Sequence, residues 1–345
     1  MESAIQYLEI GDFLTQSKGL LILDVRAPKE YKKGHIPDAV SFPLFDDAER
    51  AEVGTTYKQK SKQKAIELGL DIVGKKMGDF ARIIKTLTED KRVFIHCWRG
   101  GMRSGSLAWL INLLGYEVFV LKGGYKAYRN FVLEELGKPF SLAVLSGKTG
   151  SGKTDILQAL KNAGQQMVDL EKIANHKGSA FGGLGQPAQP TPEQFENNLQ
   201  DALASIDKEE ICWIEDESKA IGICYLPELF WLQLKQAPRY QIFVPEEKRV
   251  AHLMAQYGEF SSDDLAKCIV TLEKRLGSEA MNFTLEALAE NNLKQGALLM
   301  LQYYDKAYAY GASKKIQVPT ENIMLENQSD QEIAEILITK SKQER

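Results

Sequence analysis

The sequence predicts an α/β protein built on parallel sheets, in two successive domains with a helical extension at the carboxyl end. Short apolar segments at 20–26, 92–97 and 117–121 alternate with helical patterns, and this alternation is typical of parallel β–α–β units. A second series of the same kind starts after the Gly-Lys-Pro step at 137–139. The 345 residues suffice for about two domains of roughly 100–200 residues each.

The second half continues the pattern in order. Its predicted strands lie at 141–145, 166–170, 211–214 and 240–244. After Pro245 the pattern becomes helical to about residue 309, and a short strand at 315–318 and a helix at 330–340 close the chain. The predicted organisation is an α/β domain, a second α/β domain and a mainly helical region packed on the second, at 1–138, 139–245 and 246–345.

Composition and charge narrow the class of protein. Hydrophobic residues make up 44% and charged residues 26% of the chain, a balance that excludes a mainly disordered or collagen-like protein. No segment approaches the roughly 20 apolar residues of a membrane helix, and Met1–Ala4 lacks the basic start of a secretion signal. The net charge of −4 argues against indiscriminate coating of nucleic acid. We expect a soluble, cytoplasmic protein without membrane or DNA partners.

The cysteines form no metal-binding or disulfide framework. Cys97, Cys212, Cys224 and Cys268 include no CxxC pair, and with four histidines no zinc spacing arises. We expect buried thiols at the last three. Cys97 differs because it ends the predicted strand at 92–97. It is followed, before a helix that starts near Ser104, by Trp98, Arg99, Gly100, Gly101, Met102 and Arg103.

This segment, 97–103, is called the cysteine loop below, and its composition suits an anion. Glycines let the backbone curl, so that N–H groups of the loop and of the helix N-terminus face an anion. The same field lowers the pKa of a thiol, and the thiolate is the nucleophile. Arg99 and Arg103 offer guanidinium donors to an oxyanion. Cys97 is the predicted catalytic residue; the alternative is a buried structural cysteine beside a glycine turn.

Upstream motifs relate the first domain to a known family. DVRAPKEY at 24–31, GHIPDA at 34–39 and SFP at 41–43 resemble the rhodanese family closely, over about residues 1–135. The resemblance implies that Cys97 carries a chalcogen as a persulfide or selenide. It also implies that Asp24 and Arg26 are structural residues that brace the loop.

The cysteine loop departs from the common rhodanese pattern in length. The common loop counts six residues from its cysteine, whereas Cys97 to Arg103 counts seven, and His-Cys-x5-Arg-Ser also matches the tyrosine-phosphatase signature. A longer loop makes room for a tetrahedral phosphorus group. Two alternatives therefore stay open for this domain, a rhodanese-type sulfurtransferase and a phosphatase.

A second glycine-rich segment, called the phosphate loop below, spans 147–154. Its sequence GKTGSGKT fits GxxxxGK[ST] and lies between a predicted strand and a helix, which is the expected context. Backbone amides would hold a diphosphate or triphosphate, Lys153 adds a positive charge, and Thr154 can ligate Mg²⁺. The predicted diphosphate-binding residues are Gly147, Thr149, Gly150, Ser151, Gly152, Lys153 and Thr154.

Acidic and polar residues near the phosphate loop are candidates for substrate or metal contact. Strand 211–214 leads into Glu215 and Asp216, where a Walker B acid is expected, and a third acid follows, so the sequence leaves open which acid acts. The alternative there is a solvated strand end. Asp169 and Glu171 end the preceding strand, and the polar segment after it contributes His176 and Ser179; for the histidine the alternative is a surface loop.

Six segments taken together identify a family for the whole chain. They are CWRGGMRSGS, GGYKAYR, GKTGSGKT, DLEKIANHKGSAFG, EDESKAIG and YYDKAYAY, which start at residues 97, 123, 147, 169, 215 and 303. In this order they resemble the tRNA 2-selenouridine synthase family. The resemblance implies an enzyme that replaces sulfur by selenium in wobble-position 2-thiouridine of tRNA. Its co-substrates are selenophosphate and geranyl diphosphate, and the thiouridine is first S-geranylated.

These implied reactions suit the two loops. Alkylation makes the C2 sulfur a better leaving group, and a phosphate loop stabilises the charge that builds on a departing diphosphate. We therefore expect Gly147–Thr154 to hold geranyl diphosphate; ATP or GTP is the alternative for any such motif. Cys97 would take the selenium while Arg99 and Arg103 bind the phosphate portion. The helical region 246–310 has the apolar residues for a geranyl channel, although core packing explains them equally well.

Partners and competing functions complete the sequence-based predictions. tRNA needs cationic contacts, and the candidates are Lys58, Lys60, Lys62, Lys64, Lys126 and Arg129; a solvated helix face is the alternative for the first four. An enzyme that supplies selenophosphate is a further expected partner, and no tightly bound cofactor is predicted. The competing functions are a sulfurtransferase or phosphatase with a regulatory nucleotide-binding domain, and a non-catalytic nucleotide switch.

Overall fold

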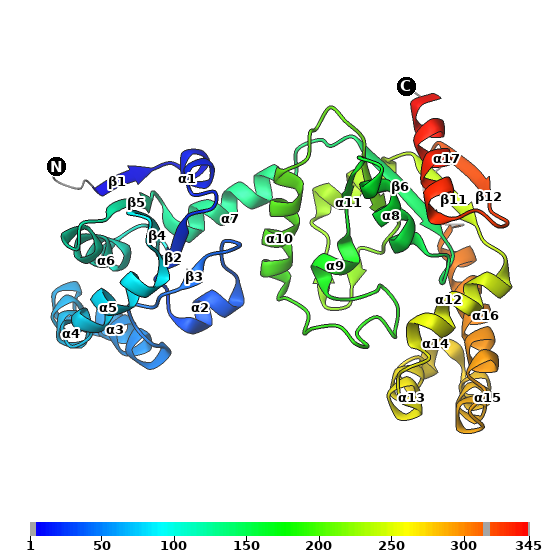
Figure 1. The fold of residues 1–345 in the computed structure, drawn as a ribbon. Coiled ribbons are helices and arrows are strands. Elements are labelled where there is room, and N and C mark those ends of the chain that lie inside the picture. The colour runs from blue at the N-terminus through cyan, green and yellow to red at the C-terminus, as the bar shows by residue number, and fades with distance from the viewer. Residues whose placement is uncertain (1–4, 313–317, 344–345) are drawn as a thin grey trace. The chain divides into compact units, whose positions relative to one another are not determined.

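A computed structural model describes residues 5–312 and 318–343 of the chain (Figure 1). The chain forms two compact units. The first contains residues 1–135 with 196–198, and the second contains residues 136–195 with 199–345. The helical residues that follow Pro245 thus belong to the second unit.

The first unit is built on a five-stranded parallel sheet in the order β1-β5-β4-β2-β3. Its strands are β1 (Ile5–Leu8), β2 (Leu21–Asp24), β3 (Val40–Ser41), β4 (Arg92–His96) and β5 (Glu117–Leu121). β4 is central and buried from Val93 onward because both faces of the sheet carry helices. The register pairs Asp24 with His96, so the segments after β2 and β4 leave the same edge of the sheet.

Seven helices connect these strands within the described part of the first unit. They are α1 (Ile10–Gln16), α2 (Pro28–Lys33), α3 (Asp47–Gln59), α4 (Lys62–Gly74), α5 (Met77–Leu87), α6 (Met102–Leu113) and α7 (Gly124–Glu135). α5 is strongly amphipathic and buries Phe80 and Ile84. α6 buries Leu107 and Ile111 against the β4–β5 side of the core. The core thereby fixes the start of α6, which follows the cysteine loop.

The second unit has its own five-stranded parallel sheet, in the order β12-β11-β6-β8-β7. The strands are β6 (Leu142–Gly147), β7 (Gln166–Val168), β8 (Cys212–Glu215), β11 (Arg239–Phe243) and β12 (Thr320–Met324), and a short antiparallel pair joins β9 (Ala220–Ile221) to β10 (Cys224–Tyr225). β6 is buried along its whole length. The strand predicted at 315–318 falls on residues that, apart from Val318, lie outside the described ones, and β12 was not predicted.

Ten helices are described in or across the second unit. They are α8 (Lys153–Asn162), α9 (Leu170–Ala174), α10 (Pro192–Ala204), α11 (Glu228–Gln236), α12 (Glu246–Tyr257), α13 (Ser262–Val270), α14 (Glu273–Leu276), α15 (Ser278–Ala289), α16 (Leu293–Ala312) and α17 (Asp330–Gln343). α8 and α17 pack together against the sheet. A separate apolar cluster joins Phe181 to α13, α15 and α16. None of the described helices is both long and apolar enough to cross a membrane.

Candidate functional site: two anion loops and a two-part cavity

The cysteine loop surrounds the sulfur of Cys97 with hydrogen-bond donors. Cys97 follows β4 directly and is 3% exposed. Its Sγ accepts hydrogen bonds from the Gly101 N–H at 3.3 Å and from the Ser104 hydroxyl at 3.2 Å. Burial by itself would raise the pKa of this thiol, but the Ser104 hydroxyl, the backbone amides of Ser104 and Arg99 and the charge of Arg103 together lower that pKa below its usual value. The geometry favours the thiolate.

A pair of glycines behind the loop sets its shape. Gly100 has φ +63° and Gly124 has φ +60°, in the left-handed region. A Cβ added to Gly124 would lie 2.3 Å from the carbonyl oxygen of Cys97. The next two residues bond the loop from the same side, since Tyr125 N–H donates to the Cys97 carbonyl at 2.8 Å and Lys126 N–H to the Trp98 carbonyl at 3.1 Å. The GGYK segment is therefore a backbone support for Cys97.

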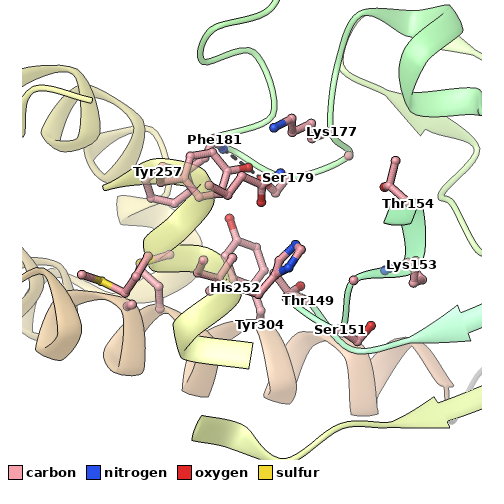
Figure 2. Close-up of a pocket in the computed structure, with 18 of the residues that line it drawn as sticks. Thr149, Ser151, Lys153, Thr154, Lys177, Ser179, Phe181, His252, Tyr257 and Tyr304 are labelled. Atoms are coloured by element: carbon pink, nitrogen blue, oxygen red, sulfur yellow. Dashed lines mark hydrogen bonds between the residues drawn. The ribbon is translucent and has the colours of Figure 1, made fainter. Parts of the chain in front are cut away.

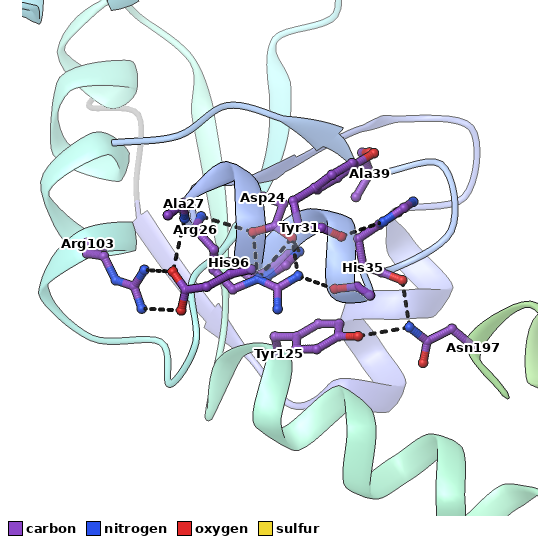
Figure 3. A network of polar contacts seen from close by, with 12 residues as sticks. Asp24, Arg26, Ala27, Tyr31, His35, Ala39, His96, Arg103, Tyr125 and Asn197 are labelled. Atoms are coloured by element: carbon purple, nitrogen blue, oxygen red, sulfur yellow. Dashed lines mark hydrogen bonds and ion pairs between the residues drawn. The ribbon is translucent and has the colours of Figure 1, made fainter. Parts of the chain in front are cut away.

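Arg103, predicted to bind an anion, is held by an acid that the sequence analysis did not single out. Its Nη1 lies 2.6 Å from Glu30 Oε2, and Nη2 lies 3.4 Å from Oε1 (Figure 3). Glu30 also accepts the Ala27 N–H at 3.0 Å. The pairing orients a guanidinium whose charge still reaches the Cys97 sulfur. The rhodanese pattern contains Glu30, but no local rule pairs two residues 73 positions apart.

The two residues assigned to bracing are buried as a pair. Arg26 donates to both carboxylate oxygens of Asp24 and, through Nη2, to the Gly34 carbonyl at 2.6 Å. Its guanidinium stacks 3.6 Å from the centre of the Tyr125 ring. His96 lies beside this pair without exposure, and burial lowers the pKa of His96 to about 4. The histidine is neutral at physiological pH.

The remaining loop residues form an accessible rim. Trp98 is 36% and Met102 57% exposed, and Arg99 is exposed as well. Trp98 packs on Tyr125, with ring centres 5.9 Å apart. Gly101 has nothing within 4 Å of an added Cβ. The cysteine loop therefore combines a buried sulfur at its base with an open, partly cationic rim.

The phosphate loop has the strand–loop–helix geometry predicted for it. It runs from Gly147, the last residue of β6, to Thr154 in the first turn of α8, and Gly150 and Gly152 take φ +79° and +71°. Lys153 Nζ lies 3.2 Å from the Gly147 carbonyl. The Ser151 hydroxyl is buried and has no partner among the described residues. Backbone amides at a helix N-terminus with a lysine beside them form an anion site.

A charged network missed by the sequence analysis fastens the phosphate loop to the helical region. Arg249 of α12 is 3% exposed, and its Nε donates to the Thr149 carbonyl at 2.8 Å. Its two terminal nitrogens bind both carboxylate oxygens of Asp305 at 3.0 and 2.6 Å. Asp305 also accepts Lys148 Nζ at 2.9 Å. Two segments far apart in the sequence, α12 and α16, thus hold the loop.

The acids after β8 have separate roles. Asp216 accepts from Arg239 at 2.6 Å and from the Ser146 hydroxyl at 2.7 Å, so its side chain is already engaged at the base of the loop. Glu215 accepts the Glu171 N–H at 3.0 Å through one oxygen, while its other oxygen is buried without a partner among the described residues. Burial and the neighbouring acids raise the pKa of Glu215 well above its usual value.

Glu171 is the acid that faces the phosphate loop. Burial, followed by the charge of Glu217, raises the pKa of Glu171 to about 8, although Lys153 opposes the shift. Glu171 and Glu217 hydrogen-bond to one another. The Thr154 hydroxyl lies 3.5 Å from a Glu171 oxygen, at the limit of a hydrogen bond. The raised pKa favours the protonated form of Glu171 at neutral pH, with its proton in the hydrogen bond to Glu217.

The other polar candidates divide between structural and lining positions. Asp169 caps α9 by accepting the Lys172 N–H at 2.7 Å. Gly182 packs closely on the ring of His176, whose pKa is lowered by burial, and His176 does not line the cavity described below. Ser179 does line it. Within residues 5–312 and 318–343, no group of His, Cys, Asp and Glu side chains is arranged to hold a metal ion.

A cavity of about 280 Å³ extends from the phosphate loop into the helical region of the second unit. Its polar end is formed by the phosphate loop, Glu171 and Glu215–Ser218. Figure 2 shows Lys153 and Thr154 on one side and Phe181 and Tyr257 on the other. The apolar end is lined by Phe181, Leu265, Ile269, Leu288, Leu293, Gly296, Ala297 and Met300. The cavity can therefore hold a molecule with an anionic head and an apolar tail.

α16 gives the cavity its direction. The Tyr308 hydroxyl lies 2.8 Å from the Ser146 hydroxyl at the end of β6, which anchors the carboxyl half of the helix near the phosphate loop. Tyr304, Met300, Ala297, Gly296 and Leu293 line the cavity from there toward the start of α16. At about 1.5 Å per residue, Leu293 is about 22 Å from Tyr308 along the helix axis. The lining changes from polar to apolar along this length.

The candidate tRNA contacts differ in availability. Lys58, Lys60, Lys62 and Lys64 are all exposed, where α3 and α4 meet, and Lys126 is exposed beside the cysteine loop. Arg129 is instead half-buried, ion-paired with Glu196 and hydrogen-bonded to Asn197. The lysines stay predicted contacts, and the arginine has a structural partner within the first unit.

Comparison with known proteins assigns both units. Residues 10–131 match the rhodanese-like domain, and residues 140–344 match the domain described as tRNA 2-selenouridine synthase AAA domain. Fold and loops thus define a protein in which a rhodanese-like unit with an activated cysteine precedes a P-loop-like α/β unit. The chain belongs to the tRNA 2-selenouridine synthase family.

Its relatives match over most of their length. A protein of Sulfurovum sp. (strain NBC37-1) named tRNA 2-selenouridine synthase is 37% identical over 84% of this chain and 88% of its own. A protein of the same name from Shewanella denitrificans (strain OS217) is 34% identical over 90% of this chain and 92% of its own. Among solved structures, the N-terminal domain of a Clostridium difficile 630 protein is 43% identical over 37% of this chain and 99% of that one, with a TM-score of 0.35.

Proposed function

We propose that this chain converts 2-thiouridine in tRNA to 2-selenouridine in two reactions, geranylation of the sulfur in the second unit and its replacement by selenium with the help of Cys97. The observation that carries the proposal is the cavity of the second unit. One end offers the amides of the phosphate loop and Lys153, and the other is lined mainly by apolar side chains. A nucleotide would place a polar ribose and base in that apolar end, whereas an isoprenoid diphosphate matches both ends.

The geranylation step follows from this fit. The sulfur of 2-thiouridine attacks C1 of geranyl diphosphate, the S–C bond forms, and the C1–O bond breaks. The diphosphate leaves with the bonding electrons, and the uracil ring releases its N3 proton. Charge that builds on the departing diphosphate is stabilised by Lys153, by the loop amides and by the unpartnered Ser151 hydroxyl. Protonation of Glu171 keeps a negative charge away from the diphosphate beside Thr154.

The apolar end supplies affinity for the chain of the donor. Each buried methylene is worth about 0.8 kcal/mol, so a ten-carbon tail contributes several kcal/mol that a nucleotide cannot recover there. Phe181 and Met300 belong to a cluster that is already packed without a ligand. A preformed wall of this kind reduces the ordering that binding would otherwise require.

Replacement by selenium follows from the alkylated product. Geranylation turns a poor leaving group into a thiolate that can depart from C2 of the pyrimidine. Selenophosphate is the proposed selenium source, and the rim of the cysteine loop offers Arg99 to its anionic phosphate. The donors around the sulfur lower the pKa of Cys97 below its usual value, which favours the thiolate that would react.

Nucleoside mass spectrometry of tRNA tests this assignment. A strain that lacks the gene is complemented with the wild-type chain, Cys97→Ser or Lys153→Ala. We expect 2-selenouridine with the wild type, accumulation of S-geranyl-2-thiouridine with Cys97→Ser, and unchanged 2-thiouridine with Lys153→Ala. Identical nucleosides in all strains contradict the function. Protection of the phosphate loop from proteolysis by ATP or GTP, but not by geranyl diphosphate, contradicts the donor.

A further inference from the structure

Oxidation states restrict what Cys97 can take from selenophosphate. Selenium in selenophosphate is already at the level of selenide. A bond between it and the Cys97 sulfur would therefore form only if an oxidant removed two electrons. A second thiol of the same unit could act as such an oxidant once it is in a disulfide, but Cys97 is the only cysteine in residues 1–135 and 196–198. A different bond to Cys97 balances without an oxidant.

The cysteine loop offers the hydrogen-bond donors that a tetrahedral oxyanion requires. Seven residues run from Cys97 to Arg103. The amides of Arg99, Gly101 and Ser104 are directed at the sulfur and hence at whatever is bonded to it. The Glu30 carboxylate contacts both terminal nitrogens of Arg103, which fixes the guanidinium in place so that its positive charge acts on the Cys97 sulfur and on an anion bonded to it.

We infer that Cys97 accepts the phosphoryl group of selenophosphate and releases the selenium as hydrogen selenide. The Cys97 thiolate attacks phosphorus, the S–P bond forms, and the P–Se bond breaks with its electrons on selenium, which takes one proton. Hydrogen selenide then adds at C2 of the geranylated base. Its proton passes to N3, and the geranyl thiolate leaves. No atom changes oxidation state. The inference rests on the proposed function for the identity of the selenium donor.

Ser104 completes the cycle as a hydrogen-bond donor to sulfur. Water attacks the phosphorus of S-phosphocysteine, the S–P bond breaks, and phosphate and a proton are released. The sulfur leaves as a thiolate, and the Ser104 hydroxyl 3.2 Å away is the side-chain donor that stabilises it. The hydroxyl is fully buried and also contacts the Gly101 carbonyl at 3.2 Å, so it is held next to the sulfur. A hydrogen bond to a charged group changes the rate of such a step about tenfold or more, here the hydrolysis of S-phosphocysteine.

The test identifies the element bound to Cys97. The purified full chain is mixed with selenophosphate, geranyl diphosphate and thiouridine-containing tRNA and quenched early. Phosphorus-31 NMR and selenium analysis are then applied to the Cys97 peptide, and mass spectrometry to the tRNA nucleosides. We expect phosphorus and no selenium on Cys97, and about tenfold more S-phosphocysteine with Ser104→Ala. Ser106→Ala is the matched control because its exposed hydroxyl bonds only the Met102 carbonyl.

The outcomes separate the inference from the proposed function. Selenium without phosphorus on Cys97 overturns the inference, as does 2-selenouridine synthesis with no adduct in Ser104→Ala. Phosphorus on Cys97 without any 2-selenouridine in the tRNA supports the phosphoryl transfer and contradicts the proposed function. If Ser104→Ala misfolds, shown by loss of its cooperative thermal transition, the wild-type chain quenched at successive times carries the test: phosphorus on Cys97 supports the inference, and selenium without phosphorus overturns it.

Discussion

The two loops have the same local architecture but differ in what their hydrogen-bond donors surround. Each follows a buried parallel strand, turns on glycines and starts a helix. In the cysteine loop the donors converge on an atom of the protein, the Cys97 sulfur. In the phosphate loop they border a cavity that a ligand can enter. The same strand–loop–helix turn thus surrounds a protein atom in one unit and borders an open space in the other.

The supports behind the loops differ as well. The cysteine loop rests on backbone contacts from Gly124 and Tyr125, at distances that leave no room for a side chain. The phosphate loop is held by long side chains, Arg249 and Asp305, from the helical region. Backbone support fixes the position of a sulfur closely. Side-chain support links the loop to the helices that form the apolar end of the cavity.

Gly124→Ala gives the largest expected effect, on the cysteine loop alone. The new Cβ would meet the Cys97 carbonyl at 2.3 Å, at a φ that alanine rarely adopts. The loop must shift, and a displacement of about 1 Å costs about 100-fold in rate. We expect at least that loss in selenium incorporation from pre-geranylated tRNA, with geranyl transfer unchanged, both measured by nucleoside mass spectrometry.

Gly105→Ala is the control for this variant. Gly105 lies in α6, and an added Cβ has nothing within 4 Å. Alanine also stabilises a helix interior by about 1 kcal/mol relative to glycine. We therefore expect Gly105→Ala to retain geranyl transfer, selenium incorporation and the melting temperature of the wild type. Equal loss of geranyl transfer and selenium incorporation in Gly124→Ala would refute the separation of the two loops.

Gly296→Leu tests the apolar end of the cavity, which only the phosphate loop possesses. Gly296 lines the cavity in the interior of α16, and its added Cβ would lie 3.5 Å from Leu288, an ordinary contact. A leucine there takes the space of about three methylenes, or about 2.4 kcal/mol of apolar burial. We expect the preference for geranyl over dimethylallyl diphosphate, as a ratio of kcat/KM, to fall about 50-fold.

Gln295→Leu is matched to that change, because it adds the same side chain one residue earlier at an exposed position that does not line the cavity. It should leave the donor preference within twofold of the wild type. A similar loss of preference in both variants would mean that a new leucine on α16 disturbs the donor preference wherever it is placed. Unaltered preference in Gly296→Leu would place the tail elsewhere.

The contiguous motifs account for what the sequence predicted correctly. The fold class, the central strands and the strand–loop–helix setting of both loops follow from alternating apolar segments and glycine patterns within about ten residues. The family resemblance extended this to the whole chain. The structure places Cys97 after β4 and Lys153 at the start of α8, as the sequence predicted. Their catalytic roles stay predictions.

The residues that the sequence did not indicate act over long separations. Arg249 reaches the phosphate loop across 100 positions and Glu30 reaches Arg103 across 73. Gly296 is one of 27 glycines, and only the cavity distinguishes it. Among the acids after β8, the sequence left the choice open because spacing cannot show that Arg239 already engages Asp216. Charge pairing of this kind depends on tertiary packing.

The smallest expected effect concerns the protonation of Glu171 next to the phosphate loop. Its pKa, raised to about 8 by burial and then by Glu217, makes it neutral below that pH and anionic above it. Asp169 and Glu217 face it as further acids, and Lys153 as the opposing cation. An added negative charge near a bound diphosphate costs about 1 kcal/mol in a water-like medium. We expect affinity for geranyl diphosphate to fall about fivefold as the pH rises through 8.

The comparison with Glu171→Gln isolates this group from the titration of the ligand, since glutamine stays neutral at every pH. Calorimetric affinities at pH 7 and 9 should therefore differ about fivefold more in the wild type than in the variant.

The same linkage applies to folding: the neutral carboxyl of Glu171 stabilises the second unit below its unfolded pKa, and that contribution is lost as the pH rises through about 8. Thermal melting of Glu171→Gln should accordingly decline less between pH 7 and 9. If the affinity of wild type and variant for geranyl diphosphate changes with pH in parallel, Glu171 does not face the diphosphate. The contrast would then fail between a cysteine loop that stabilises a thiolate and a phosphate loop that requires neutral acids beside it.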